Sequence, residues 1–377
     1  MNPQSDSSCT SPVDALIMAP SLGMRFSGIN ATMEALLPVM KRTIPIACCG
    51  KNLSEKMPTT TLRDWLRSSK RDQWRIWHSR RNNDMIVGLF LRYVLRHKLI
   101  MLWTSAAQRR HTWFTRQLYR HMDAIIATTE TAANFLDRSS TVSHHGVDTS
   151  VYTPPQSRSA VRADLNLPNQ RTLGVFGRVR PQKGTGDLVE ALCQVLPEFP
   201  NWRIVFVGAT TEQYLPYKQQ LESQLQKVGI DHQVTFTGFL KNFDDLPKWY
   251  QAVDVVGCVS RNEGFGVTCL EGMASGAPVL ATKAGAWPDI VEEGKTGWIA
   301  EANDPADLAR ALRLTLSTSQ ADLFRMGQQA LATIHDRYTI HHESDRIVAV
   351  YRELLERYGE ELPAVSEVPT HAERRAA

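Results

Sequence analysis

Short apolar runs alternate with longer amphipathic stretches along nearly the whole chain. The apolar runs predict buried strands, and the stretches between them repeat apolar residues at helical spacing. The predicted strands are 13–18, 44–48, 99–104, 124–127, 141–147, 172–176, 203–207, 234–237, 255–259, 278–281 and 296–300. Strands that alternate with helices in this way indicate an α/β fold built from doubly wound parallel sheets.

The predicted helices fill most of the gaps between these strands. They are 28–42, 84–97, 107–121, 130–136, 187–196, 212–228, 244–252, 267–274, 305–316, 320–332 and 341–358. The charged stretch 50–83 has weak periodicity, so we expect it to leave the first sheet.

A proline-containing stretch interrupts the alternation and predicts a domain boundary. It carries Pro154, Pro155 and Pro168 among serines and arginines, a composition typical of linkers. A chain of 377 residues is also too long for one ordinary core. We therefore expect two Rossmann-like domains, 1–150 and 171–337, that face a cleft.

The remaining segments are assigned from the same pattern. Residues 151–170 are expected to form the linker between the domains. A helix at about 338–358 is expected to pack back on the N-terminal domain. The polar tail 359–377 contains two prolines and is expected to be disordered.

Composition narrows the class of protein. No leading segment has the order of a signal peptide, and the most apolar run, 85–103, is broken by Arg92, Arg96, His97 and Lys98. The six cysteines show no metal-ligand spacing, so reduced thiols in the cytoplasm are the simplest interpretation.

Basic residues and tryptophans are concentrated between positions 63 and 120, although the net charge of the whole chain is only +4. This combination suits an anionic membrane surface, where rings lie at head-group depth and cations meet phosphate. A nucleic-acid surface and an ordinary solvated basic face remain the alternatives. The tryptophans are Trp65, Trp74, Trp77 and Trp113.

Residues 260–278, SRNEGFGVTCLEGMASGAP, contain the strongest chemical signal. They lie between two predicted strands and should form a turn and then a helix that stops at Gly276. Gly264 and Gly266 leave the backbone open to a close ligand, and a helix N-terminus directs N–H groups at an anion. Glu263 and Glu271 can accept hydrogen bonds from hydroxyls. The site therefore suits a molecule that combines sugar and phosphate, although either acid alone could be an ordinary surface acid.

The chain resembles the family-4 glycosyltransferases, retaining enzymes with the GT-B fold. The resemblance is carried by FGRVRPQKG, by VSRNEGFGVTCLEGMASGAPVLATKAGAWPDIV and by HHGVDTSVYTP. It covers the second domain and the linker, and the first domain more loosely. It implies an N-terminal acceptor-binding domain and a C-terminal domain that binds a nucleotide sugar.

The resemblance also implies roles for individual residues. Glu271 would bind the nucleotide ribose and Glu263 would lie against the transferred sugar, with Arg178 and Lys183 as a catalytic clamp on the diphosphate. The other donor-binding positions implied are Gly28, Gly264, Phe265, Gly266 and Val267, the last three through their backbone amides. No metal and no cofactor besides the donor would be needed.

The implied reaction takes place on one face of the sugar, and the leaving phosphate helps to deprotonate the acceptor. The chain departs from the family pattern in two places. The usual double glycine near the first helix is Ser27 and Gly28, and the histidine that many relatives carry after the fourth strand is replaced by Ser105 and Ala106. Whether His111 or His144 substitutes for that histidine is left open.

The segment LWTSAAQRRHTWFTRQLYRHMDAIIATTE most resembles the lipopolysaccharide core mannosyltransferases. This implies GDP-mannose as donor and a Kdo-bearing lipid A intermediate as acceptor, with the enzyme peripheral on the inner face of the cytoplasmic membrane. The alternatives are a UDP-hexose transferase acting on another lipid or small acceptor, a GT-B epimerase, and a non-catalytic binder. No nucleic-acid partner is expected.

Overall fold

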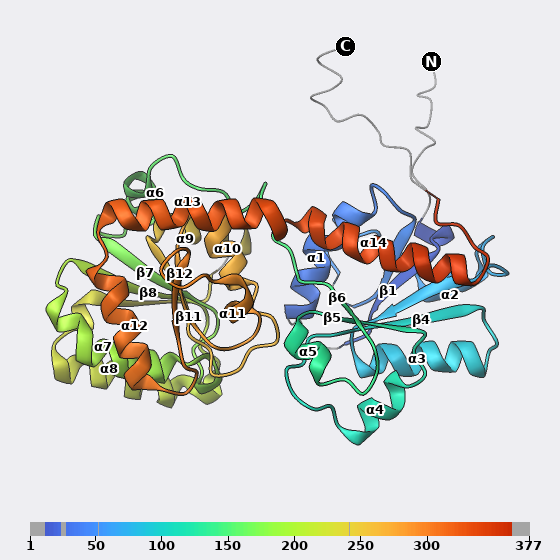
Figure 1. The fold of residues 1–377 in the computed structure, drawn as a ribbon, viewed down its shortest axis with the longest axis horizontal. Helices are drawn as coiled ribbons and strands as arrows, with labels where there is room; N and C mark the ends of the chain where they lie inside the picture. Colours follow the sequence, from blue (N-terminus) through green and yellow to red (C-terminus); the bar gives the residue numbers. More distant parts are fainter. Residues whose placement is uncertain (1–11, 24–27, 52, 241, 364–377) are drawn as a thin grey trace, which may run out of the picture. The chain divides into compact units, whose positions relative to one another are not determined.

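The computed structural model describes residues 12–23, 28–51, 53–240 and 242–363. These residues fall into two compact units, shown in Figure 1. The first is drawn from Met1–His145 and Ile340–Ala377, and the second from Gly146–Thr339. The expected disordered tail lies mostly outside the described residues.

The first unit is built on a parallel sheet of six strands in the order β2-β1-β3-β4-β5-β6. The strands are β1 (Ile17–Ser21), β2 (Ile46–Gly50), β3 (Arg75–Ser79), β4 (Leu99–Ser105), β5 (Ala124–Ala127) and β6 (Thr141–Val142). Its helices are α1 (Gly28–Met40), α2 (Leu62–Arg67), α3 (Asn82–Tyr93), α4 (Trp113–Tyr119), α5 (Glu130–Asn134) and α14 (Ile340–Arg357). Helices α1 and α14 share one apolar core with the sheet, and α2, α3 and α4 share the other.

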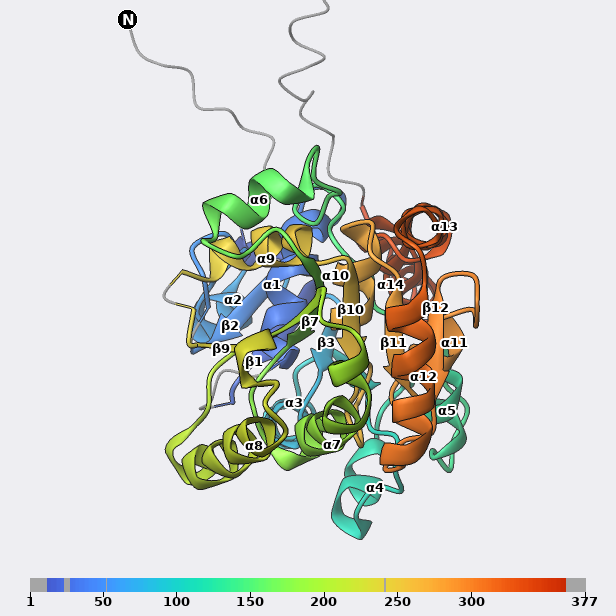
Figure 2. The ribbon, with the colours of Figure 1, turned by 90° about the vertical axis from the view of Figure 1, so that its left-hand side faces the viewer.

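The second unit has a parallel sheet of six strands in the order β12-β11-β10-β7-β8-β9. The strands are β7 (Arg171–Phe176), β8 (Trp202–Val207), β9 (Val234–Gly238), β10 (Val255–Cys258), β11 (Val279–Thr282) and β12 (Gly297–Ala300). Its helices are α6 (Arg158–Asp164), α7 (Thr185–Val195), α8 (Leu215–Val228), α9 (Leu246–Ala252), α10 (Thr268–Ala274), α11 (Trp287–Ile290), α12 (Pro305–Ser317) and α13 (Gln320–Arg337). Figure 2 shows α7, α8 and α12 on one side of this sheet and α9 and α10 on the other.

The predicted fold class is confirmed, since both units are parallel sheets covered by helices on both faces. Helix α14 packs on α1 and β3 and so belongs to the first unit. Most predicted elements fall within a few residues of the observed ones, because apolar runs mark strands that are buried on both faces.

One prediction within the first unit is wrong. The stretch 50–83 does not leave the sheet, because it contains β3. This strand lies in the sheet between β1 and β4. This strand reads RIWHS, and its charged and polar residues conceal it from an analysis of apolar runs. Arg75 is fully buried, donates to the Trp65 carbonyl at 2.6 Å, and lies over the Trp65 ring at 3.9 Å.

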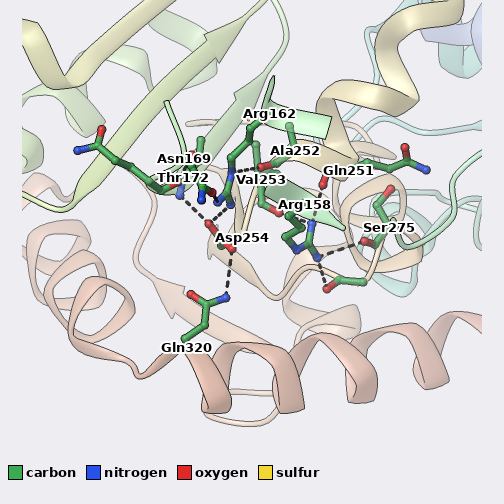
Figure 3. A network of polar contacts seen from close by, with 12 residues as sticks. Arg158, Arg162, Asn169, Thr172, Gln251, Ala252, Val253, Asp254, Ser275 and Gln320 are labelled. Carbon is green, nitrogen blue, oxygen red and sulfur yellow. Dashed lines mark hydrogen bonds and ion pairs between the residues drawn. The ribbon is translucent and has the colours of Figure 1, made fainter. Parts of the chain in front are cut away.

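The stretch expected as a linker, 151–170, is part of the second unit. Figure 3 shows how two arginines of α6 hold it there. Arg162 forms a buried ion pair with Asp254 and donates through Nε to the Ala252 carbonyl at 2.8 Å. Asp254 also accepts from the Thr172 amide at 2.7 Å, so this network fixes the starts of both β7 and β10.

Arg158, the first residue of α6, extends the network to the C-terminal end of α10. It donates to the Gly276 carbonyl at 2.7 Å and to the Ser275 carbonyl at 3.4 Å. It also donates to the carbonyls of Gln251, at 3.0 Å, and Val253. The proline-containing stretch is therefore a set of anchors for α9, α10 and β10 and not a free connection.

Candidate active site

The candidate site lies at the carboxyl ends of β7 and β10, which are adjacent in the second sheet. In parallel sheets the loops that follow adjacent strands meet at the same edge, where ligands commonly bind. The loop after β7 carries Arg178 and Lys183, and the loop after β10 carries Glu263.

The two loops are tied together by direct contacts. The Arg261 amide donates to the Gln182 carbonyl at 3.0 Å, and the Arg261 guanidinium forms a two-pronged ion pair with Asp187 at 2.5 and 2.8 Å. Gly184 has a φ of +65°, and a Cβ there would collide with the Val259 carbonyl oxygen. The loops therefore form one structure with a fixed spacing.

Lys183 and Glu263, both predicted site residues, are brought into contact by this arrangement. Lys183 Nζ lies 2.5 Å from Glu263 Oε2, and both side chains are mostly buried. The Ser260 hydroxyl donates to the same carboxylate oxygen at 3.2 Å. A cation and an acid held together at a strand end can contact an anion and a hydroxyl of the same ligand.

Arg178 lies beside this pair and is exposed. It lines, together with Gly177, Lys183 and Thr268, a cavity of about 10 Å³, which is room for about one water molecule. Among the described residues Arg178 has no carboxylate partner, whereas Lys183 does. The guanidinium is thus available to an anion from solvent.

Packing within the protein requires the glycine at position 266 of the EGFG segment. Gly266 has a φ of +89°, and a Cβ there would come within 2.6 Å of Trp287 Cε2. The Trp287 indole N–H in turn donates to the Gly266 carbonyl at 2.8 Å. The Ala286 amide donates to the Phe265 carbonyl at 2.9 Å. Packing against α11 therefore explains why glycine stands at 266.

Val267 is the N-cap of α10, and Glu271 lies one turn into the helix. The helix ends as predicted at Gly276, where φ is +71°. The amides of Gly276 and Ala277 bond the carbonyls of Met273 and Gly272, which is the Schellman pattern.

Glu271 accepts hydrogen bonds from two tyrosines. The Tyr250 hydroxyl donates to Oε2 at 2.6 Å, and Tyr152 also donates to this carboxyl group. Burial raises the pKa of Glu271, while the two tyrosine hydrogen bonds and the positive charge of Lys183 partly offset that rise. The carboxylate is therefore oriented before any ligand arrives.

Sequence reasoning did not identify Tyr152 and Tyr250 as part of the site. Tyr152 lies in the stretch expected as a linker, and Tyr250 lies in α9. The Tyr250 ring stacks on Phe176 at 3.6 Å and meets the Tyr152 ring edge-on at 5.5 Å. Burial raises the pKa of both hydroxyls, so both are donors at neutral pH. No residue spacing connects positions 152, 250 and 271.

The first unit contains the remaining predicted positions. Gly28 is the exposed first residue of α1, and a Cβ there would meet no neighbouring atom. His111 Nε2 lies 3.0 Å from the hydroxyl of Ser105, the last residue of β4. Burial lowers the pKa of His111, so its ring is neutral at physiological pH. His144 contributes its carbonyl to a hydrogen bond from Arg346.

His78 is a histidine that the sequence analysis did not consider. It is fully buried in β3, with its two ring nitrogens 2.6 Å from the hydroxyls of Tyr351 and Thr104. Burial holds the pKa of His78 well below its usual value. This residue links α14 to β3 and β4 and has a structural role.

Metal-binding clusters and membrane-spanning helices are absent from the described residues. No group of three or more histidines, cysteines or carboxylates there is placed to hold a metal ion. No helix formed by those residues has the length and apolar character needed to cross a bilayer. The described cysteines, Cys48, Cys49, Cys193, Cys258 and Cys269, are all free.

Comparison with known proteins agrees with this geometry. Residues 157–331 match the family model described as glycosyl transferases group 1. The chain is 38% identical to the lipopolysaccharide core biosynthesis mannosyltransferase LpcC of Rhizobium leguminosarum bv. viciae, over 91% of this chain and 97% of the relative. It is 36% identical to LpsB of Rhizobium meliloti, which has the same description, over 91% and 98%.

A solved structure, Anabaena Alr3699/HepE in complex with UDP, superposes with a TM-score of 0.77. The match covers 89% of this chain and 99% of the other at 19% identity, which is evidence for the fold alone. The predicted GT-B fold is thereby confirmed. Given relatives that match over nearly their whole length, the chain belongs to the group 1 glycosyltransferases.

Proposed function

We propose that this glycosyltransferase moves mannose from GDP-mannose onto a lipopolysaccharide inner-core acceptor of the Kdo-lipid A type, with retention of configuration. The names of two relatives at 38% and 36% identity support mannose and the lipopolysaccharide core. The single observation that carries the catalytic part is the contact between Lys183 and Glu263 at the edge of the second sheet.

Different residues of the second unit contact different parts of the donor. Arg178 and Lys183 contact the diphosphate, and Glu271 accepts hydrogen bonds from the ribose. Glu263 and the backbone from Gly264 to Val267 hold the sugar. The bond between the anomeric carbon and the phosphate oxygen breaks, and the acceptor oxygen bonds to the same face. The acceptor proton passes to the leaving phosphate.

Cationic side chains stabilise the leaving diphosphate in this scheme, so no metal ion takes part. EDTA is expected to leave turnover unchanged. A complete loss of activity in EDTA that manganese restores would exclude the scheme.

The role of Lys183 is tested by Lys183→Ala. Lys183 lies in the loop after β7 and belongs to neither apolar core of the second unit, so the fold should survive while kcat falls by about a hundredfold or more. Lys218→Ala is the matched control, because Lys218 forms an ion pair of the same 2.5 Å length with Glu222 and is equally buried. Unchanged turnover of Lys183→Ala in a radiolabelled-mannose assay would reject the clamp.

Donor identity is tested by a thermal-shift panel of GDP- and UDP-sugars. A donor present at about a hundred times its dissociation constant should stabilise the protein by about 2.7 kcal/mol. We expect GDP-mannose to give the largest shift. A larger shift with UDP-glucose or UDP-galactose would replace the donor in the proposal and leave the transferase reaction intact.

The acceptor determines where the enzyme works. A Kdo-bearing lipid A intermediate is held in a membrane, so we propose that the enzyme is cytoplasmic and peripheral on the inner face of the cytoplasmic membrane. Cell fractionation tests this location, with release of the protein from membranes by high salt as the expected result.

A further inference from the structure

The outer faces of α3 and α4 are apolar although they are exposed. In α3, Met85, Gly88 and Leu91 face the core of the first unit. At about 100° per residue, Ile86 and Phe90 point to the opposite side of the helix. We call the following exposed residues the α3–α4 face: Ile86, Phe90, Tyr93, Val94, Leu95, Trp113 and Phe114.

The two helices that carry the α3–α4 face contact one another. Asn82 at the start of α3 donates to the Thr115 hydroxyl in α4 at 2.9 Å. The Tyr93 ring meets His121, just beyond α4, edge-on at 6.1 Å. Both helices lie on the same side of the first sheet in Figure 1, below β4. Isolated exposed apolar residues are common, but a cluster on two adjoining helices indicates a binding surface.

Positive charge surrounds the α3–α4 face. The exposed basic residues Arg96 and Lys98 follow α3, Arg109 and Arg110 precede α4, and Arg120 ends it. The only acid between positions 82 and 122 is Asp84. It is buried and accepts hydrogen bonds from the amides of Leu22, Arg80 and Arg81. The surface is therefore apolar at its centre and cationic at its edges.

We propose that the α3–α4 face docks on an anionic lipid bilayer, with the apolar side chains in the head-group region and the basic residues on lipid phosphates. The face contains aliphatic as well as aromatic residues, and Ile86, Val94 and Leu95 offer no stacking platform for bases. Apolar side chains flanked by arginine and lysine are the composition of an interfacial helix. This deepens the membrane location proposed above and rests on it.

Only some of the tryptophans that suggested a membrane surface are exposed. Trp65 and Trp77 are fully buried in the core, so the expected tryptophan-rich basic face does not exist as such. Trp113 is 66% exposed and belongs to the α3–α4 face. Arg67 ends α2 and Arg71 follows it. Both are exposed, and neither belongs to the α3–α4 face.

The test is sedimentation of the full chain with vesicles, which requires neither donor nor acceptor. The wild type should bind vesicles that contain phosphatidylglycerol at about one part in three, and bind pure phosphatidylcholine much less. Phe90→Ser combined with Trp113→Ser should lower partitioning by about tenfold or more. The matched control is Phe324→Ser in the second unit, where Phe324 is 67% exposed, and it should bind as the wild type does.

Charge reversal distinguishes vesicle binding through a specific face from binding through the net charge of the protein. Arg109→Glu with Arg110→Glu should lower binding by about tenfold or more, whereas Arg67→Glu with Arg71→Glu should lower it by less than about threefold. Equal losses in the two pairs would overturn the proposal, since both pairs change the net charge equally.

Three other results would also overturn the proposal. One is failure of the wild type to bind either kind of vesicle. Another is a lipid-free dimer that Trp113→Ser dissociates, which would identify the face as a subunit interface. The third is binding of a single-stranded oligonucleotide that vesicles do not displace. Iodide quenching of wild-type tryptophan fluorescence gives a reading without any variant, and vesicles should reduce it because Trp113 becomes covered.

Donor-induced thermal shifts should be unaffected by variants of the α3–α4 face, because the donor residues proposed in the second unit are untouched. Normal donor shifts with no vesicle binding would reject the docking face alone. Vesicle binding without any donor shift would reject the proposed donor site and leave the docking face intact.

Discussion

Tyr250→Phe removes one hydroxyl from the candidate site and leaves the ring in place. The ring is fully buried and stacked on Phe176, so phenylalanine fills the same space. The lost hydrogen bond, 2.6 Å to Glu271 Oε2, is one to a charged acceptor. Such bonds contribute about 1.5–3 kcal/mol, which corresponds to an affinity change of about ten- to a hundredfold if Glu271 binds the ribose.

The effect on pH dependence has a defined sign. Glu271 is ionised above its pKa and becomes protonated as the pH falls through that value. Burial already raises this pKa, and the Tyr250 hydroxyl opposes the rise. Removing the hydroxyl raises the pKa further, so the loss of donor affinity on acidification should begin at a higher pH.

Stability should change in the same pH window. Because the pKa of Glu271 in the folded protein lies above the ordinary value of 4.5, the folded state holds the proton more tightly than the unfolded state. The contribution of this group is therefore most favourable below pH 4.5 and declines as the pH rises through the folded pKa. In Tyr250→Phe this decline should extend to higher pH.

Calorimetric titration of the donor across the acidic and neutral range measures the first effect, and urea unfolding at the same pH values measures the second. Tyr351→Phe is the control, since Tyr351 is also fully buried and its hydroxyl bonds His78 at 2.6 Å in the first unit. It should alter stability without moving the pH profile of donor binding. A wild-type profile in Tyr250→Phe would show that this tyrosine does not tune Glu271.

Three further predictions concern the second unit and the thiols. Asp254→Ala breaks a buried ion pair and should lower the free energy of unfolding by about 3–5 kcal/mol, as measured by urea titration. Gly266→Ala should destabilise by about 1–3 kcal/mol more than Gly229→Ala, because both have positive φ but only Gly266 lies against an indole; equal losses in thermal melts would contradict this. Burial raises the pKa of Cys48 and Cys49 to about 12, so iodoacetamide at pH 8 should leave both unmodified by mass spectrometry unless the protein is unfolded.

The order of strands and helices could be predicted from the sequence because most strands of both sheets are buried on both faces and read as apolar runs. The strand β3 is the exception that shows the limit. Arg75, His78 and Ser79 are buried within it, and partners distant in sequence accommodate the first two: the Trp65 carbonyl and Ser68 for Arg75, and Thr104 and Tyr351 for His78. Local periodicity contains no information about such partners.

The candidate site could also be predicted only in part. The residues within recognisable motifs could be found, whereas their partners elsewhere in the sequence could not. Glu263, Lys183 and Glu271 carry a recognisable spacing, and the structure places the first two in contact. The two tyrosines that orient Glu271 are 119 and 21 residues away from it, and no motif joins them. The motif singled out Gly266 as a donor-binding position, and the structure shows that a side chain there would also collide with the indole of Trp287.

The two arginines of α6, Arg158 and Arg162, help to fix the elements that carry the candidate site. Arg162 and Asp254 fix the starts of β7 and β10, the strands whose opposite ends carry Lys183 and Glu263. Arg158 holds the carbonyls that end α10, whereas Trp287 holds the loop that begins it. Glu271 therefore lies on a short helix restrained at both ends. The donor contacts proposed above require fixed distances between two loops and this helix. They would therefore depend on a segment whose composition alone suggests a flexible connection.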